Sequence, residues 1–211
     1  MNALVAVAIH DAKNALNTLN VLIAQARQEC AAPALEQAQA VAARIGAQLV
    51  ELLAFYRADQ GMLRLAVDDR YLDDFVADVM AELEPPPPPG ITLLTDFAAA
   101  AEIGSWAFDA YQVKFVLLDA LRNALRHAAG QVHFALAVAT DGGIRFSVSD
   151  DGPGYPPAVL DGGVAAMADG SSGLGLSFAR LIAAHHATPA GRHGYVELAN
   201  AGGACFSLVL P

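Results

Sequence analysis

The spacing of apolar residues in the first part of the chain constrains the fold more than any other feature of the sequence. Apolar residues from Ile9 to Cys30 follow one another at steps of three and four, and a second series from Leu35 to Tyr56 does the same after a break at Pro33. This spacing is typical of helices that pack through one narrow apolar seam. Because two such helices cannot bury both seams alone, we expect a helical hairpin that pairs with a second copy as a dimeric four-helix bundle.

The pattern changes near residue 61, where strand-like and helix-like segments begin to alternate. We expect strands over 62–67, 91–98, 131–139 and 144–150, helices over 70–84, 109–128 and 170–186, and a final hairpin of 195–200 with 204–210. The five prolines at 85–89 are interpreted as a stiff connector that ends a helix, in preference to a ligand for an aromatic groove. The predicted fold class is α+β, with a helical hairpin (residues 1–60), a hinge at 56–62 and a two-layer α/β sandwich (residues 61–211).

Composition and charge exclude several classes of protein. Hydrophobic residues make up 55% of the 211 residues and charged residues 16%, which excludes a disordered chain, and the net charge of -10 argues against nucleic acid as the main partner. Cys30 and Cys205 support neither a disulfide framework nor a metal site. No apolar run has the length of a membrane helix, and the start lacks the features of a signal peptide. We expect a soluble, cytoplasmic protein whose signal sensor lies in a separate protein or in a sensor domain missing from this sequence.

Two glycine-rich segments can bring the backbone close to a ligand, because glycine has no side chain to keep the ligand away. "VSDDGPGY" (148–155) follows a predicted strand, and "GSSGLGLSF" (170–178) opens a predicted helix, where free amides and the helix dipole favour phosphate oxygens. Neither segment alone distinguishes a ligand site from a turn. The helix between them carries a polar stripe that faces either solvent or a charged ligand: Asp119, Asn123, Arg126 and His127.

Together with "HDAKN" at 10–14, these segments resemble the sequence boxes of bacterial sensor histidine kinases. "DALRNALRHA" (119–128), "DDGPG" (150–154) and "GLGL" (173–176) follow in the order of the N box and the two glycine boxes of that family. The resemblance covers nearly the whole chain. It implies a dimerisation and histidine-phosphotransfer hairpin, followed by an ATP-binding domain of the gyrase, Hsp90, kinase and MutL (GHKL) superfamily.

For the hairpin, the resemblance implies that His10 attacks the γ-phosphoryl group of ATP, after which the phosphoryl group passes to an aspartate of a response regulator. Asp11 is expected to accept the Nδ1 proton of His10, whose imidazole is mostly neutral near pH 7. Asn14, one turn further on, is expected to act when the regulator is dephosphorylated, and Lys13 is placed to attract phosphate. Without the other motifs, His10 would be interpreted as an ordinary exposed helix residue.

For the second domain, the resemblance implies ATP and Mg²⁺ as ligands. Asn123 matches the Mg²⁺ ligand of the family, and Asp119 stands where most sensor kinases carry asparagine. We assign Asp119 to the metal and keep slow ATP hydrolysis as its alternative role. Segment 155–172 is expected to form a mobile lid. The remaining expected nucleotide-binding residues are Arg126, His127, Asp150, Gly152, Gly154, Gly173, Leu174 and Gly175, with a plain helix-capping role as the alternative for His127.

These features predict a histidine kinase core that autophosphorylates on His10 and phosphorylates a response regulator, with phosphatase activity toward the regulator as a further expectation. Two alternatives stay open. One is a non-enzymatic phosphotransfer or signalling adaptor whose second domain only docks partners. The other is an ATP-hydrolysing clamp or a serine-directed kinase of the same superfamily, in which His10 has no role.

Overall fold

The computed structural model describes residues 32–83, 86–161 and 174–211, together with Ala12, Ala15, Thr18, Leu19 and Leu22 as helical positions. Most of the expected first helix therefore lies outside the described residues. The chain forms two compact units, and one boundary between them falls between Leu63 and Arg64.

The first unit contains one long described helix, α2 (Ala32–Asp59). Pro33 stands in its first turn, where the missing amide proton costs no helical hydrogen bond. The helix confirms the second predicted helix. It also continues through the first four residues of the expected hinge at 56–62, so that prediction began too early. The amide of Gly61 donates to the carbonyl of Ala58 and closes the helix end.

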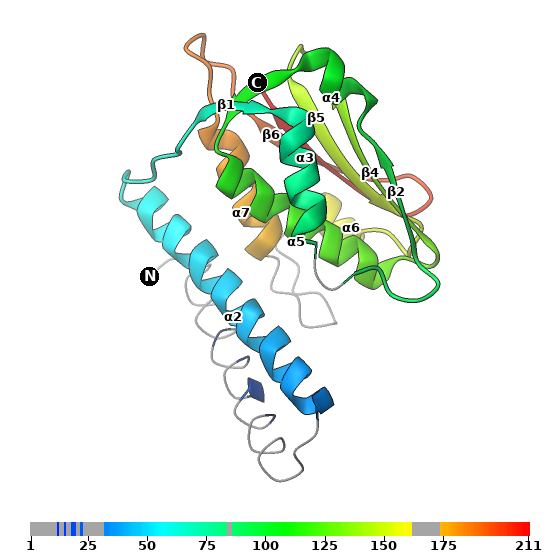
Figure 1. The fold of residues 1–211 in the computed structure, drawn as a ribbon. Helices are drawn as coiled ribbons and strands as arrows, with labels where there is room; N and C mark the ends of the chain where they lie inside the picture. Colours follow the sequence, from blue (N-terminus) through cyan, green and yellow to red (C-terminus); the bar gives the residue numbers. More distant parts are fainter. Residues whose placement is uncertain are drawn as a thin grey trace. The chain divides into compact units, whose positions relative to one another are not determined.

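The second unit is built on a five-stranded mixed sheet (Figure 1). Its strand order is β2 (Thr92–Asp96), β4 (Gln131–Val138), β5 (Ile144–Asp150), β7 (Ala204–Leu210) and β6 (Tyr195–Asn200). Strand β2 runs parallel to β4, and the other neighbouring pairs are antiparallel. Both predicted hairpins, β4–β5 and β6–β7, are confirmed. This pairing brings four strand ends together at one end of the sheet: the start of β4, the end of β5, the start of β7 and the end of β6.

A separate two-stranded ribbon pairs β1 (Asp68–Tyr71) with β3 (Ser105–Phe108). The strand expected over 62–67 is wrong, because this segment has no regular structure and the strand begins only at Asp68. The amide of Ala66 donates to the side chain of Asp109 at 2.8 Å, so the segment is held by a side chain and not by a sheet partner. Strand β3 and the short helix α4 (Ala98–Ile103) were not predicted.

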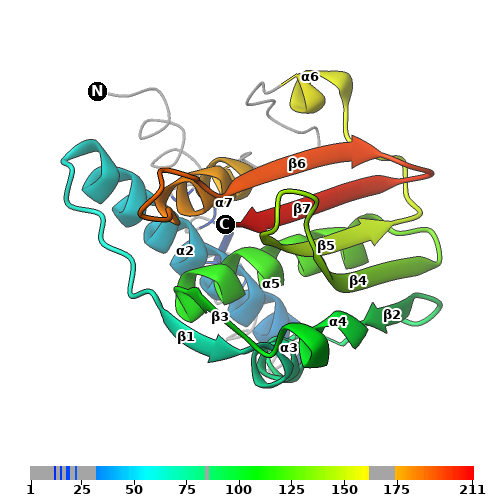
Figure 2. The same cartoon turned by 90° about the horizontal axis from the view of Figure 1, so that it is seen from above.

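Three helices, α3 (Leu72–Ala81), α5 (Ala110–His127) and α7 (Leu174–His185), cover one face of the five-stranded sheet, and a fourth helix, α6 (Pro157–Leu160), has a single turn (Figures 1 and 2). Along β5, buried Ile144, Phe146 and Val148 alternate with less buried residues. This alternation is the pattern of a sheet with one covered face. The α+β fold and its two-layer sandwich are thus confirmed.

Aromatic side chains fix the helices on the sheet. Phe75 of α3 meets Phe108 and Phe146 edge-on, with ring centroids 4.8 and 5.6 Å apart. Phe115 of α5 meets Phe178 of α7 in the same way at 5.2 Å. Such contacts add to the free energy gained by burying the rings. The α5–α7 contact matters for function, because these two helices carry the polar stripe and the second glycine segment.

The described prolines, 86–89, lie in neither a helix nor a strand. Helix α3 ends at Ala81, before the prolines begin, and the amide of Ile91 donates to the carbonyl of Pro88 at 3.0 Å to close a turn. The run therefore connects a helix to a strand, as predicted. None of the helices in the described part of the chain is long and apolar enough to cross a membrane.

Candidate functional site

Helix α5 presents the predicted polar stripe on the side that is not packed into the core. Asp109 precedes the helix and caps it, since its Oδ1 accepts from the amide of Gln112 at 3.0 Å. Its buried residues are apolar, among them Val113, Leu117 and Leu121. The stripe residues are exposed at Asp119 and Arg126 and half-buried at Asn123 and His127. Sequence periodicity therefore placed this face correctly.

The same helix approaches both glycine segments. A Cβ atom on Gly152 would collide with the carbonyl oxygen of His127, at the end of α5. A Cβ atom on Gly175, in the first turn of α7, would collide with the carboxylate of Asp119. At Gly152 the obstacle is backbone, so only glycine permits the approach. At Gly175 a larger residue would displace the Asp119 carboxylate. The middle of α5 thus lies against the start of α7, and the end of α5 lies against the loop after β5.

The loop after β5 begins with Asp150, the last residue of that strand. Its Oδ1 accepts from the amide of Gly152 at 2.8 Å and, more weakly, from the amide of Ala204 at 3.4 Å. Gly203 lies so close to the carbonyl of Asp150 that a side chain there has no room. The expected adenine-binding carboxylate is therefore held in place by its own loop and by the start of β7.

The next residue, Asp151, joins this loop to the end of α5. Its Oδ1 accepts from three successive amides, those of Ala129, Gly130 and Gln131, at 2.8 to 3.0 Å. These amide hydrogen bonds, led by those of Gln131 and Gly130, hold the pKa of Asp151 below its usual value. The turn that follows the polar stripe is thus fixed to the first glycine segment.

The far end of the loop is held by Asn200, the last residue of β6. Its Oδ1 accepts from the amide of Tyr155 at 2.8 Å, and its Nδ2 donates to the carbonyl of Tyr155 at 2.9 Å. The ring of Tyr155 is buried, and this burial, followed by the nearby charge of Asp150, raises the pKa of its hydroxyl. Tyr155 therefore stays neutral at physiological pH.

Asp119 carries the single carboxyl group of the stripe. Crowding by protein atoms raises its pKa, and the positive charges of Arg126 and Arg122 act in the opposite direction. The residue nevertheless keeps an exposed surface, so solvent tempers the effect of crowding. The carboxyl oxygens of Asp119 thus lie near two positively charged side chains.

A buried histidine connects the far end of α7 to the start of α5. The Nδ1 of His186 donates to the carbonyl of Ile182 at 2.9 Å, and its Nε2 accepts from the amide of Asp109 at 3.0 Å. The bond to Nε2 requires the neutral ring, because a protonated Nε2 cannot accept, and burial lowers the pKa of His186. Because Asp109 also binds the amide of Ala66, this corner ties the segment before β1 to both helices.

The structure describes most of the predicted nucleotide residues and none of the predicted phosphotransfer residues. His10, Asp11, Lys13, Asn14 and Gly173 lie outside the described residues. Leu174 begins α7 with a fully buried side chain, so only its backbone can face a ligand. The described start of the expected lid is held by buried Tyr155 and Val159, and its positions 162–172 lie outside the described residues.

Four residues that shape the site were absent from the sequence prediction: Asp109, Asp151, His186 and Asn200. The capping role of Asp109 has a local signal, since an aspartate directly before a predicted helix is a common N-cap. The other three act on partners at least 20 residues away in the chain. No local sequence pattern predicts contacts between residues so far apart in the chain.

Residues 108–211 match the family described as histidine kinase-, DNA gyrase B-, and HSP90-like ATPase. No curated protein sequence matches the chain. The Acinetobacter baumannii histidine kinase AdeS is similar in structure, with a TM-score of 0.69 at 15% identity over 95% of this chain and 96% of its own.

Two further solved structures agree. ShkA, solved at full length in complex with AMPPNP, has a TM-score of 0.62 at 19% identity over 98% of this chain, which spans 44% of ShkA. The cytoplasmic segment of histidine kinase QseC has a TM-score of 0.55 at 18% identity, over 78% of this chain and 94% of its own. Residues 108–211 thus match the model of this ATPase family. The chain as a whole has the fold of a sensor histidine kinase catalytic core.

Proposed function

We propose that this protein is a histidine kinase core that binds ATP between α5, the loop after β5 and the start of α7. The observation that supports the proposal best is the contact of one helix with both glycine segments. His127 lies against Gly152, and Asp119 lies against Gly175. Residues up to 56 positions apart in the chain thus border one region, with backbone amides and a polar stripe facing it.

In this proposal Asp150 accepts the amino proton of adenine, and the backbone at Gly152 and Gly154 lets the base approach. Arg126 neutralises phosphate charge, and the first turn of α7 offers amides to phosphate oxygens. Position 127 contributes its backbone to the wall of the loop, and Gly173 and Leu174 complete the expected phosphate segment.

The residues present fit Mg²⁺. The described residues include no cluster of three or more His, Cys, Asp or Glu that would hold a metal by itself. Mg²⁺ commonly takes only one or two protein oxygens and completes its shell with phosphate and water. Asn123 and Asp119, one helical turn apart, offer such oxygens. When bound there, the ion would neutralise phosphate charge.

The phosphoryl step follows from the resemblance at residues 10–14. His10 Nε2 forms a bond to the γ-phosphorus of ATP, the bond to the bridging oxygen breaks, and ADP leaves with those electrons. Asp11 holds the Nδ1 proton and so stabilises the charged ring. The phosphoryl group then passes to an aspartate of a response regulator. In the separate phosphatase reaction, Asn14 positions a water molecule that hydrolyses the aspartyl phosphate of the regulator.

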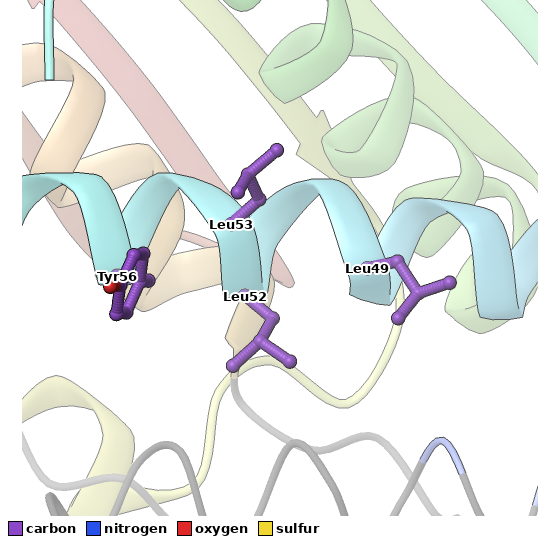
Figure 3. A pocket seen from close by; sticks show the side chains of 4 residues that line it. All are labelled: Leu49, Leu52, Leu53 and Tyr56. Atoms are coloured by element: carbon purple, nitrogen blue, oxygen red, sulfur yellow. The ribbon is translucent and has the colours of Figure 1, made fainter.

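The proposal extends to a cytoplasmic homodimer that receives its signal from a separate sensor protein or domain. Helix α2 supports dimer formation, because Leu49, Leu53 and Tyr56 remain about half exposed along it. These residues and Leu52 line a hollow of about 390 Å³ (Figure 3). A second copy of the chain would cover this surface.

Nucleotide binding is tested with Asp150→Asn and a matched control, Asp141→Asn. Both aspartates accept a backbone amide two residues on, but Asp141 lies in the β4–β5 hairpin. We expect Asp150→Asn to weaken Mg-ATP binding at least tenfold in calorimetry, because an amide presents a donor beside the base, and the control to bind normally. Equal binding by all three proteins would refute the adenine-binding role of Asp150.

Catalysis is tested by incubation with γ-labelled ATP and Mg²⁺. We expect an acid-labile, base-stable label that is lost in His10→Ala while Mg-ATP binding persists. A label that survives His10→Ala would identify another acceptor, and an acid-stable label would indicate a serine kinase. If the wild type binds no nucleotide at all, the adaptor becomes the better description.

A second candidate function is slow ATP hydrolysis, and the position of Asp119 favours it. Its carboxylate lies against the first turn of α7, where phosphate is expected, and can polarise water. We expect Asp119→Asn to lower phosphate release in the absence of a regulator if Asp119 has this role. Unchanged phosphate release in the variant would leave Asp119 only the metal role.

A further inference from the structure

We propose that Asn200 is a positioning residue that fixes the base-binding loop, residues 150–155, and thereby sets the preference for adenine. This inference rests on the proposed function. Asn200 stands at the end of β6, 45 residues from the loop in sequence. It pairs with both backbone groups of Tyr155, accepting from the amide at 2.8 Å and donating to the carbonyl at 2.9 Å. These two hydrogen bonds resemble those of a hydrogen-bonded residue pair in an antiparallel sheet, with a side-chain carboxamide in place of one backbone.

The contact is specific to a carboxamide at this position. Its carbonyl oxygen accepts and its NH₂ group donates, which matches the two groups of one peptide residue. Ser and Asp each lack part of this pairing, because serine has one polar atom and ionised aspartate has no donor. The geometry therefore selects Asn among residues of this size.

Gly154 completes the arrangement. Its φ is +79°, a conformation that residues with side chains rarely adopt. A Cβ atom there would also lie 2.8 Å from the Cγ and Oδ1 atoms of Asn200. Gly154 is therefore required twice, once for its backbone angles and once to admit the carboxamide of Asn200.

The loop is held at two ends by different elements. Asp150 and Asp151 fix its first half through amides of Gly152 and of the turn after α5. Asn200 fixes its second half to β6. A carboxylate that reads the amino group of adenine needs a fixed direction, since discrimination between bases depends on hydrogen-bond geometry. By closing the loop, Asn200 keeps Asp150 in that direction without touching the base.

The test compares Asn200→Ala with Tyr195→Phe in the full chain. Tyr195 lies on the same strand and donates from its hydroxyl to Asp141 at 3.3 Å, far along the strand from the loop. We expect Asn200→Ala to weaken ATP binding about tenfold, the loss of two modest hydrogen bonds, and to reduce the preference for ATP over GTP. Binding of inorganic tripolyphosphate should not change. Tyr195→Phe should bind both nucleotides as the wild type does.

A double-variant cycle addresses the contact directly. Gly154→Ala should weaken ATP binding in the wild type through strained backbone and a collision with Asn200. In the Asn200→Ala background the collision is gone, so the same change should cost less affinity. If Gly154→Ala weakens ATP binding equally in the wild type and in Asn200→Ala, the carboxamide of Asn200 does not contact position 154 in the way described.

The outcomes separate this inference from the proposed function. If the wild type binds no ATP, the proposed function fails, and this inference fails with it. If the wild type binds ATP and Asn200→Ala binds ATP and GTP in the wild-type ratio, the positioning role is refuted while the proposed function stands. A fall in tripolyphosphate binding equal to that of ATP would also refute it, because it would indicate general loss of structure.

Discussion

The two units of this protein treat apolar side chains in opposite ways. The ATP-binding unit encloses large residues such as Phe108, Phe134 and Phe146, none of which is exposed to solvent. Helix α2, by contrast, leaves Leu49, Leu53 and Tyr56 at 52, 47 and 55% exposed. A helix with such a stripe gains stability only when another surface covers it. Within the described residues, one unit carries a complete core, whereas α2 of the other leaves an apolar stripe exposed, and we propose that a partner covers this stripe.

The largest expected effect breaks the core of the ATP-binding unit. Phe146→Ala removes a buried ring that meets Phe75 edge-on and leaves a cavity. We expect the free energy of unfolding to fall by about 3 to 5 kcal/mol, measured by urea denaturation. A loss below about 1 kcal/mol would mean that this unit does not rely on the core described here.

The second effect concerns α2. Replacing Leu49 and Leu53 together by glutamine should weaken self-association at least tenfold, because each leucine buried by a partner contributes about 1.5 to 3 kcal/mol. Light scattering across a concentration series measures the change. ATP affinity serves as the control and should stay normal. Unaltered association, or a wild type that is monomeric throughout, would contradict the partner-dependent half of the comparison.

The third effect shows how the ATP-binding unit responds to acid. Burial lowers the pKa of His186, so the unfolded chain binds more protons than the folded one below the unfolded pKa near 6.5. The contribution of neutral His186 to the free energy of unfolding should be fully present above that pH. It should fall as the pH drops toward the pKa of His186 in the folded protein. The slope for one proton is at most about 1.4 kcal/mol per pH unit.

Urea midpoints between pH 7.5 and 5.5 measure the slope, with His186→Gln as the comparison. The facing groups are the Asp109 side chain, which favours the charged ring, and neighbouring His185, which opposes it. In His186→Gln the free energy of unfolding should depend less steeply on pH than in the wild type. Identical slopes in both proteins would show that His186 titrates alike in the folded and unfolded chain.

The smallest effect tests the surface of the ATP-binding unit. Lys114 of α5 forms an ion pair with Glu82, which is largely exposed. We expect Lys114→Met to change the free energy of unfolding by less than about 1 kcal/mol, and salt to reduce the difference further. Urea denaturation at two salt concentrations makes the measurement. A loss as large as that of Phe146→Ala would place surface charge, and not the core, at the centre of this unit's stability.

Local patterns predicted much of the fold. The alternation in β4 and β5, the "TDGG" turn between them and the 3.6-residue period of α5 each depend on residues close together in sequence, and the structure has all three. The strand expected at 62–67 failed because the hydrogen bond from Ala66 to Asp109, 43 residues away, replaces a sheet partner. Short apolar runs are ambiguous unless their partner is known.

The site shows the same division. The polar stripe of α5 and the two glycine segments were visible in sequence, since their spacing and composition carry the signal. Their meeting was inferred only from a family resemblance. What brings Asp119 to Gly175 and His127 to Gly152 is the packing of α5 on the sheet and beside α7, to which the edge-on contact of Phe115 with buried Phe178 contributes.

The amino-acid sequence alone thus determined the order of most elements and which face of an element is apolar. It also determined where glycine lets the backbone approach another group closely. Tertiary structure decided which groups hold those places: Asn200 on Tyr155, Asp151 on the turn after α5 and His186 on Asp109. The physical reason is that propensity and periodicity act over a few residues. A hydrogen bond between distant residues exists only once the core has brought their backbones together.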